Sequence, residues 1–388
     1  MTDYCAGYSK LGAYDRIAGM IFGHALGDAV GLITEFQEQY SAEDVKYPYE
    51  KSIRNVKPCD WTDDTDLLLL TMGSLMENNM KFIRSDIAQR FVYWCHKGLS
   101  YAGDTVPKTP NNTFKYIVTQ KDYLTNVQGV AKRVAEQSKG SLVSNSPITR
   151  IAIAGTLPNP PEITEELCKM THVDQRCVAA CVFYTCVLNA LIYSTTIDVD
   201  TIIATAKSIA LEYLDAKEQP EFESVLIRGM QAPVAAFNLR EMSRATNIYK
   251  TLLCVMYALN IIKCAQKHNR TPSFSKCIYS VVRCGGDADA NGIMVGTILG
   301  AYLGYKGLPQ EWVTAMPNSI HLNQFAATYM NRLFNPTTFE DNRDAFESMN
   351  ENVESTSAVG EVSTVGGDEV ITLEQDGADT VENSAGSD

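Results

Sequence analysis

The stretch RCGGDADANGIMVGTILGAYLG, residues 283–304, decides how this chain folds. It places Asp287 and Asp289 two residues apart in a glycine-rich turn and then continues into an apolar segment. Glycines recur at every fourth position from Gly292 to Gly304, so on a helix they would share one face. Such a face lets a second helix approach closely, and core packing alone is enough to explain it. The stretch predicts a buried helix headed by two carboxylates.

The acidic turn looks like the beginning of an EF-hand calcium loop. An EF-hand requires a glutamate at the twelfth loop position, where both of its carboxylate oxygens bind the ion. Counting from Asp287, the twelfth residue is Ile298, inside the apolar run. The sequence therefore excludes an EF-hand and leaves two aspartates that could close a metal site with other carboxylates.

A second acidic stretch, DWTDDTDLLLL at residues 60–70, stands at the start of another apolar helix. Thr62 or Asp63 can cap that helix, and acids are favourable at its positive end. Capping does not explain four neighbouring carboxylates, whose repulsion calls for a cation, and oxygen ligands suit Mg²⁺ or Mn²⁺. Capping and metal binding both stay open from these residues alone. A terpene-synthase DDxxD motif is excluded, because its third acid would fall at Leu67.

The rest of the chain favours helices. Hydrophobic residues recur with period 3.6 in six segments, while no segment alternates convincingly as a strand would. Proline-containing stretches at residues 107–110 and 157–161 are typical of loops. The predicted fold class is all-α, with expected helices at residues 15–31, 66–79, 85–99, 173–194, 199–216 and 245–265.

Charge separates the chain into two parts. The net charge is −13, but the segment from Glu347 to the C-terminus holds eleven acidic residues and no lysine or arginine, which leaves about −2 for residues 1–346. A nearly neutral body argues against a nucleic-acid-binding surface. The tail has too few apolar residues to fold. We expect one domain at residues 1–346, followed by an acidic disordered tail at residues 347–388.

Cysteine usage and the N-terminus bear on location. The eleven cysteines contain no CxxC pair, which argues against disulfides and zinc and indicates a reducing compartment. The N-terminus carries charges and no long apolar core, so we expect no secretory signal. The longest apolar runs are about fourteen residues long, shorter than the roughly 20 residues that span a bilayer. We expect a protein of the cytoplasm, with the nucleus as second option, that is neither secreted nor membrane-bound.

Six motifs, taken in order, resemble the ADP-ribosylglycohydrolases, the family of dinitrogenase reductase-activating glycohydrolase and the ADP-ribosylserine and ADP-ribosylarginine hydrolases. The resemblance covers roughly residues 15–315, and its RCGGDAD form is most similar to the bacterial and fungal branch. The motifs are GHALGDAVGLITEF (23–36), WTDDTD (61–66), GDTV (103–106), SNSPITRIAIAG (144–155), THVDQRC (171–177) and RCGGDADANG with GAYLGYKGLPQEW (283–312).

The resemblance implies an orthogonal helical bundle with a dinuclear metal cleft, holding two Mg²⁺ ions, with Mn²⁺ as the alternative. One ion would be held by Thr62, Asp63 and Asp64, and the other would be held or bridged by Asp287 and Asp289. Glu35 would ligate metal or gate the site and help catalysis. The implied catalytic residues are Glu35, Asp63 and Asp64.

The resemblance also implies a set of substrate-binding residues. A loop of small residues and backbone amides would wrap the pyrophosphate, and such loops need no positively charged body. Arg150 could instead only brace this loop, Asp104 could only cap a turn, and a lone histidine is often structural. The implied substrate-binding residues are Asp104, Gly140, Ser141, Ser144, Asn145, Arg150, His172 and Asp174.

Two departures from the family pattern bear on activity. Ala290 stands where the family commonly has a metal-ligating threonine, and Ser146 stands where it usually has glycine. Three functions remain: a metal-dependent hydrolase, an ADP-ribose-binding protein with weakened catalysis, and a structural descendant such as the lens crystallins of this family. Packing alone gives no reason to keep so many carboxylates, which disfavours the third, while Ala290 keeps the second open.

We favour the hydrolase. It would cleave the glycosidic bond at the anomeric ribose carbon of ADP-ribosylated proteins or small ADP-ribosyl conjugates and release ADP-ribose. We expect it to work as a monomer, with no nucleic acid or membrane among its partners.

Overall fold

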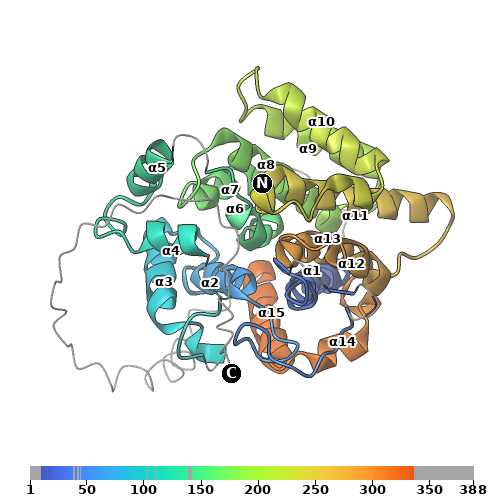
Figure 1. Cartoon of the computed structure of the whole chain (residues 1–388), viewed down its shortest axis with the longest axis horizontal. Helices are drawn as coiled ribbons and strands as arrows, with labels where there is room; N and C mark the ends of the chain where they lie inside the picture. Colours follow the sequence, from blue (N-terminus) through green and yellow to red (C-terminus); the bar gives the residue numbers. More distant parts are fainter. Residues whose placement is uncertain are drawn as a thin grey trace, which may run out of the picture.

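The computed structural model describes residues 10–37, 40–41, 43, 45–102, 104–109, 111–138 and 142–335. Within these residues the chain forms fifteen α-helices and five short 3₁₀ helices, without a β-strand (Figure 1). Two isolated bridges, Ile53 with Val56 and Ser144 with Asn247, are the only β-type pairings in this part of the chain. The all-α prediction is confirmed, and the predicted tail at residues 347–388 lies outside the described residues.

The helices follow one another closely along the chain. The first eight α-helices are α1 (Lys10–Gly31), α2 (Asp63–Glu77), α3 (Arg84–Lys97), α4 (Asn112–Val118), α5 (Val127–Gln137), α6 (Ser146–Arg150), α7 (Pro160–Cys168) and α8 (Gln175–Tyr193). The others are α9 (Val199–Leu211), α10 (Gln219–Gln231), α11 (Ile248–Lys267), α12 (Phe274–Val282), α13 (Ala288–Leu303), α14 (Gln310–Ala315) and α15 (Ser319–Phe334). The 3₁₀ helices are η1 (Ser100–Ala102), η2 (Ala152–Thr156), η3 (Val234–Phe237), η4 (Met242–Arg244) and η5 (Tyr305–Gly307).

All six helices expected from periodicity exist, with ends that differ by a few residues. Helix α2 begins at Asp63, three residues before the predicted start, because Thr62 takes the N-cap position and the acids fill the first turn. The loop predicted at residues 157–161 ends early. Pro160 and Pro161 occupy the first turn of α7, where a missing N–H costs nothing.

Helices α1 and α13 pack against each other through glycines on both sides (Figure 1). A Cβ atom built on Gly23 would lie 2.2 Å from the carbonyl oxygen of Gly296, and one built on Gly296 would lie 2.0 Å from the carbonyl oxygen of Gly23. The two backbones therefore touch, which side chains would prevent. The same contact repeats along the antiparallel pair at Gly19 with Gly300 and at Gly27 with Gly292.

This contact sets the position of the predicted acidic turn. At the end of α1, a Cβ on Gly31 would lie 2.2 Å from the Cα of Asp289. Two bonds then tie the next residues to the same turn: Thr34 Oγ1 donates to the carbonyl of Val282 (2.6 Å) and the N–H of Phe36 to that of Gly286 (2.8 Å). The residue between these anchors is Glu35.

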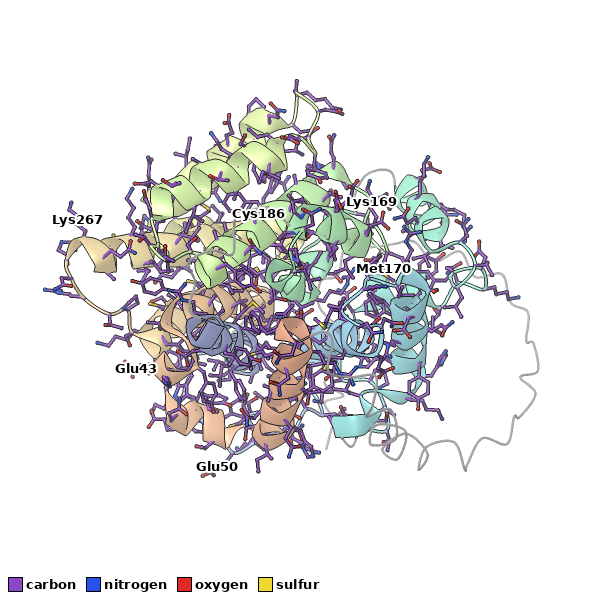
Figure 2. All side chains as sticks on the ribbon, turned by 180° about the vertical axis from the view of Figure 1, so that it is seen from behind. Glu43, Glu50, Lys169, Met170, Cys186 and Lys267 are labelled. Atoms are coloured by element: carbon purple, nitrogen blue, oxygen red, sulfur yellow. The ribbon has the colours of Figure 1, made fainter. Side chains whose placement is uncertain are left out.

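The core is formed mainly by apolar side chains of α1, α2, α8, α11 and α13. Helices α8 and α11 are long and apolar enough to cross a membrane, but 72% and 67% of these windows are buried inside the fold. Core helices of soluble proteins meet the same criterion, so this is weak support for a membrane span. Charged side chains such as Glu50 and Lys267 lie at the outer edge of the molecule (Figure 2).

We expect Gly296→Ala to lower the free energy of unfolding by about 3 kcal/mol or more, because backbone atoms cannot yield to the new methyl group. Gly73→Ala makes the same change inside α2, where the methyl would meet a movable Arg90 Nη1 at 3.1 Å. There the gain in helix propensity offsets the contact, and we expect a change within about 1 kcal/mol. Urea-unfolding midpoints measure both variants. Equal effects of the two substitutions would contradict the backbone contact.

Candidate metal and active site

Three carboxylates meet where α1 ends and α13 begins. Glu35, Asp287 and Asp289 are all buried, and one oxygen from each lies within 4.8 Å of the others. Asp287 is the N-cap of α13 and Asp289 lies in its first turn, so the positive end of this helix faces the acids. The structure thus brings together three of the predicted metal ligands.

The acids at the start of α2 belong to the same centre. Burial raises the pKa of Asp64 well above its usual range, and the charges of Asp289 and Asp28 raise it further. Burial likewise raises the pKa of Asp63, followed by the charges of Asp64 and Asp289. For Asp287 the causes are burial and then Asp289. The carboxylates of the two motifs, far apart in sequence, are therefore close enough to act on one another electrostatically, and we call them together the acidic centre.

Asp28 is a member of this centre that the sequence analysis did not assign. Its two carboxylate oxygens accept bonds from the N–H and hydroxyl groups of Thr62 (3.1 and 2.8 Å) and Thr65 (3.1 and 2.6 Å). Because Thr62 donates its hydroxyl hydrogen to Asp28, its oxygen lone pairs stay available for a cation. Burial and the charge of Asp289 raise the pKa of Asp28 to about 7. The sequence did offer a signal for Asp28, because it is an acidic residue among the glycines of an otherwise apolar helix.

Other side chains hold single carboxylates in place. Asn145 Nδ2 donates to Asp287 Oδ2 at 2.7 Å, and Thr149 Oγ1 donates to Asp64 Oδ1 at 2.6 Å. The N–H of Ala290 donates to Asp289 Oδ1 at 2.7 Å. Asn145 thus positions an acid in this structure, while its predicted contact with pyrophosphate stays a prediction. One oxygen of each of the three carboxylates has a fixed partner, which fixes the direction of the other.

Arg54 contacts the centre from a tight turn. Its guanidinium is bonded to the Glu35 carboxylate and donates to the Glu35 carbonyl (3.3 Å). Arg54 and Asn55 have φ angles of 46° and 64°, in the left-handed region, and the 53–56 bridge closes this turn. Burial still raises the pKa of Glu35 well above its ordinary value, and the opposing effect of Arg54 is smaller.

A divalent cation fits this centre. The charge of one guanidinium does not balance the carboxylates of Asp28, Glu35, Asp63, Asp64, Asp287 and Asp289, of which all but the half-buried Asp64 are buried. The donors are all oxygen atoms, which Mg²⁺ and Mn²⁺ prefer. The residues that would hold such ions are Thr62, Asp63, Asp64, Asp287, Asp289 and Glu35.

Asp60 and Asp66, the outer acids of the stretch at residues 60–70, lie in a different cluster. Lys108 Nζ lies 3.1 Å from Asp60 Oδ2 and 3.8 Å from Asp66 Oδ1, and also 3.6 Å from Asp104 Oδ2. Asp66 accepts two tryptophan N–H bonds as well (2.8 and 3.0 Å). Asp60 and Asp66 thus have partners within the protein, Lys108 for both and two tryptophan N–H groups for Asp66, so only Asp63 and Asp64 of the four acids remain as metal ligands. Asp104 belongs to this cluster.

Arg150 lies where the bracing alternative expects it. Its guanidinium is buried, donates to the Ser146 carbonyl (2.7 Å) and to Thr171 Oγ1 (2.6 Å), and stacks on the rings of Phe91 and Phe114. These contacts hold α6, at the end of the predicted substrate-binding segment, against the motif at residues 171–177. Its role in substrate binding stays a prediction.

The remaining predicted substrate residues lie near this loop. His172 is buried, and its ring bonds to Ser144 Oγ at 2.7 Å, with a pKa that burial lowers to about 3. The ring is therefore neutral, and it fixes Ser144. Asp174 caps α8 and pairs with Arg176 at 2.8 Å. Gly140 and Ser141 lie outside the described residues.

Comparisons with known proteins agree with this architecture. A family model described as ADP-ribosylglycohydrolase matches residues 9–341. The chain is 21% identical over 326 residues to ADP-ribosylarginine hydrolase Tri1 of Serratia proteamaculans (strain 568), covering 80% of this chain and 78% of the relative. A solved structure titled ADP-ribosylglycohydrolase-related protein complex is similar in fold, with a TM-score of 0.59 and 19% identity, over 83% of this chain and 99% of that one.

The raised pKa values predict a pH-dependent stability. Between about pH 4 and pH 7 the folded protein keeps a proton on Asp28 that an unfolded aspartate has released, so stability falls as the pH rises through this window. In EDTA we expect the melting temperature to be lower at pH 8 than at pH 5, and Mg²⁺ or Mn²⁺ to raise it more at pH 8. Asp64→Asn, which removes one of these acids, should flatten the slope. A melting temperature that rises with pH in EDTA would contradict this.

The lysine cluster gives a separate prediction. Lys108→Met leaves two fully buried aspartates without a cation, and we expect a loss of about 3–5 kcal/mol of stability. Adding Asp66→Asn to this variant should recover part of the loss. Lys57→Met removes an exposed lysine nearby and should change stability by less than about 0.5 kcal/mol. Denaturant midpoints test this, and equal effects of the two lysine variants would refute the structural role of Lys108.

Proposed function

This chain belongs to the ADP-ribosylglycohydrolase family, and we propose that its acidic centre hydrolyses the glycosidic bond at the anomeric ribose carbon of an ADP-ribosyl group. The substrate is an ADP-ribosylated protein or a small ADP-ribosyl conjugate, and the product is free ADP-ribose. The observation that carries the proposal is the meeting of Glu35, Asp287 and Asp289 in one buried cluster that interacts electrostatically with Asp63 and Asp64. The relative named an ADP-ribosylarginine hydrolase supports the same class of substrate.

The centre would hold two divalent cations, Mg²⁺ or Mn²⁺, through the six residues named above. When bound, such ions supply positive charge that orients the ribose hydroxyls and activates an attacking water. The fit rests on uncompensated buried carboxylates and on the free lone pairs of the Thr62 hydroxyl.

The side chains have separate tasks in this reaction. Cleavage at the anomeric carbon passes through a positively charged, oxocarbenium-like transition state, which nearby carboxylates stabilise. Glu35 sits on a backbone fixed by the bonds of Thr34 and Phe36, and burial raises the pKa of its carboxyl, which favours the protonated form. It can therefore transfer a proton to or from the reacting groups. Asp63 and Asp64, fixed at the first turn of α2, would orient the water.

A second candidate function is ADP-ribose binding with weakened catalysis. Ala290 follows Asp289 in α13 and is buried, so this position offers no hydroxyl to an ion. Its N–H instead fixes Asp289. One ligand fewer would weaken one ion site, with water filling the position. We favour the hydrolase because the carboxylates that the resemblance assigns to both ion sites are present and adjoining.

We also propose that the protein acts as a monomer in a reducing intracellular compartment. The ten cysteines in the described residues are all free. This accords with a chain that needs no disulfide for stability.

The test is release of ADP-ribose from arginine-linked and serine-linked ADP-ribosyl peptides, with Mg²⁺ and with EDTA. We expect release from one linkage only when the metal is present, and Glu35→Gln should lower kcat by at least about 100-fold while ADP-ribose still binds. Glu50→Gln, an exposed glutamate away from the centre, is the matched control and should retain full activity.

Release that continues unchanged in Glu35→Gln would remove Glu35 from the mechanism. No release from either peptide by the wild type, with ADP-ribose still bound, would replace the hydrolase with the binding protein.

A further inference from the structure

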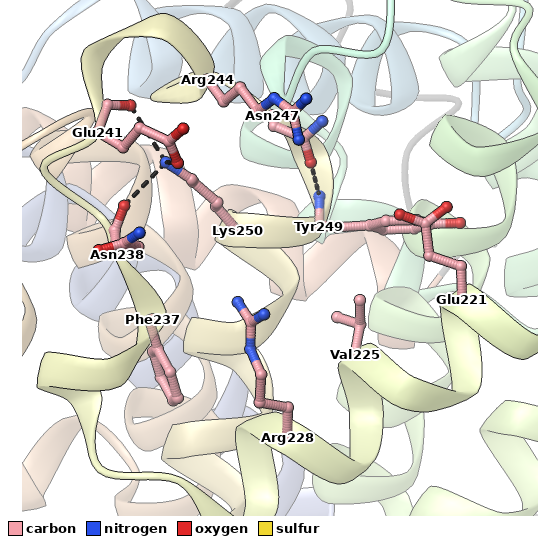
Figure 3. A pocket seen from close by; sticks show the side chains of 10 residues that line it. All are labelled: Glu221, Val225, Arg228, Phe237, Asn238, Glu241, Arg244, Asn247, Tyr249 and Lys250. Atoms are coloured by element: carbon pink, nitrogen blue, oxygen red, sulfur yellow. Dashed lines mark hydrogen bonds and ion pairs between the residues drawn. The ribbon is translucent and has the colours of Figure 1, made fainter.

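A cavity of about 210 Å³ lies between α10, the segment at residues 234–247 and the start of α11 (Figure 3). None of the residues assigned above to the acidic centre or to substrate binding lines it. Its lining is mostly polar and includes three cationic side chains, Arg228, Arg244 and Lys250. The acids that line it are Glu221 and Glu241.

One cation and one acid of this cavity neutralise each other. Lys250 Nζ lies 3.1 Å from the Glu241 carboxylate and also donates to the carbonyls of Asn238 (2.8 Å) and Glu241 (3.1 Å). Figure 3 shows these bonds joining Lys250 to the segment before α11. Lys250 is therefore a structural residue, and its charge is not available to a ligand.

Arg228 and Arg244 are the other two cationic side chains that line the cavity. Across the part of the chain that the structure describes, the guanidinium groups of Arg228 and Arg244 form no ion pair and no hydrogen bond. Arg228 comes from α10 and Arg244 from η4, so they reach the cavity from different elements (Figure 3). Guanidinium groups present planar sets of N–H donors that match phosphate oxygens.

A buried hydroxyl group in the same wall also lacks a partner. Tyr249 is 6% exposed, yet its Oη has no hydrogen-bond partner among the described residues. Its side chain runs from α11 toward Glu221 (Figure 3). An unpartnered buried hydroxyl is costly, and native proteins seldom leave one without a ligand or an ordered water.

We propose that this cavity binds a small phosphorylated molecule that also carries a free hydroxyl, such as a sugar phosphate. The phosphate takes the N–H donors of Arg228 and Arg244, and the hydroxyl lies between Tyr249 Oη and the Glu221 carboxylate. A ligand hydroxyl that donates to the Glu221 carboxylate would explain why this acid lines a cavity beside two arginines. The cavity size suits a small ligand rather than a dinucleotide.

The cavity shares a wall with the loop that holds the acidic centre. The N–H of Asn145 donates to the carbonyl of Thr246 at 2.7 Å, and the N–H of Ile248 donates to that of Val143. The same Asn145 bonds Asp287. A ligand that orders Arg244 would steady this segment and, through it, Asn145. This consequence rests on the proposed function, whereas ligand binding itself does not.

The experiment is isothermal titration of the full chain in EDTA with ribose 5-phosphate and with inorganic phosphate. We expect saturable binding of ribose 5-phosphate, tighter than that of phosphate, that survives a saturating amount of ADP-ribose. Both arginines are exposed, so Arg228→Ala/Arg244→Ala should fold normally and bind at least tenfold more weakly. Tyr249→Phe should reduce the preference for ribose 5-phosphate over phosphate. Lys276→Ala/Arg270→Ala, which removes two exposed cations that do not line the cavity, should bind as the wild type does.

Three results would overturn the proposal. These are an absence of binding to the wild type, unchanged binding in the double arginine variant, and loss of ribose 5-phosphate binding when ADP-ribose is added. The last would place the ligand in the acidic centre. None of these results depends on hydrolysis, so the proposed reaction stands or falls separately.

Discussion

The contact between the glycine faces of α1 and α13 is the constraint on which the rest of the structure depends. Backbone meets backbone at Gly23 and Gly296, so the two helices have one possible distance and little freedom to slide. The register places Gly31 against Asp289. Residues just beyond α1 must then meet the turn before α13, and Glu35 lands beside Asp287 and Asp289. The close glycine contact between α1 and α13 thus brings together acids from two distant parts of the chain.

The acids at and just before the start of α2 fall into two groups. Asp60 and Asp66 pair with Lys108, and Asp66 also accepts two tryptophan N–H bonds. The other two, Asp63 and Asp64, face further carboxylates, and burial holds their pKa values high. Such an arrangement weakens the metal-free fold, which the apolar core of α8, α11 and α13 must offset. Asp63 and Asp64, which have no lysine partner, are therefore the acids that indicate a functional site.

The helices and the residues of each motif could be predicted from the sequence, but most contacts between residues far apart in the chain could not. Periodicity predicted the helices, the glycine row predicted a close helix contact, and the resemblance indicated which acids share a cleft. The sequence did not show that Lys108 pairs with Asp60 and Asp66, because only the fold brings together ion-pair partners about forty residues apart. The contact of Arg54 with Glu35 could not be predicted for the same reason, and bracing by Arg150 was one of two alternatives whose partners only the fold identifies. Spacing reveals which residues share a helix face, but the opposite wall of a site comes from packing.

The most direct test of the central claim is a crystal structure grown with Mn²⁺, with anomalous scattering data collected at the manganese edge. The account predicts two anomalous peaks enclosed by Glu35, Thr62, Asp63, Asp64, Asp287 and Asp289, with the Arg54 guanidinium displaced from the carboxylate of Glu35. An empty centre in which these carboxylates bond to one another through retained protons would contradict it.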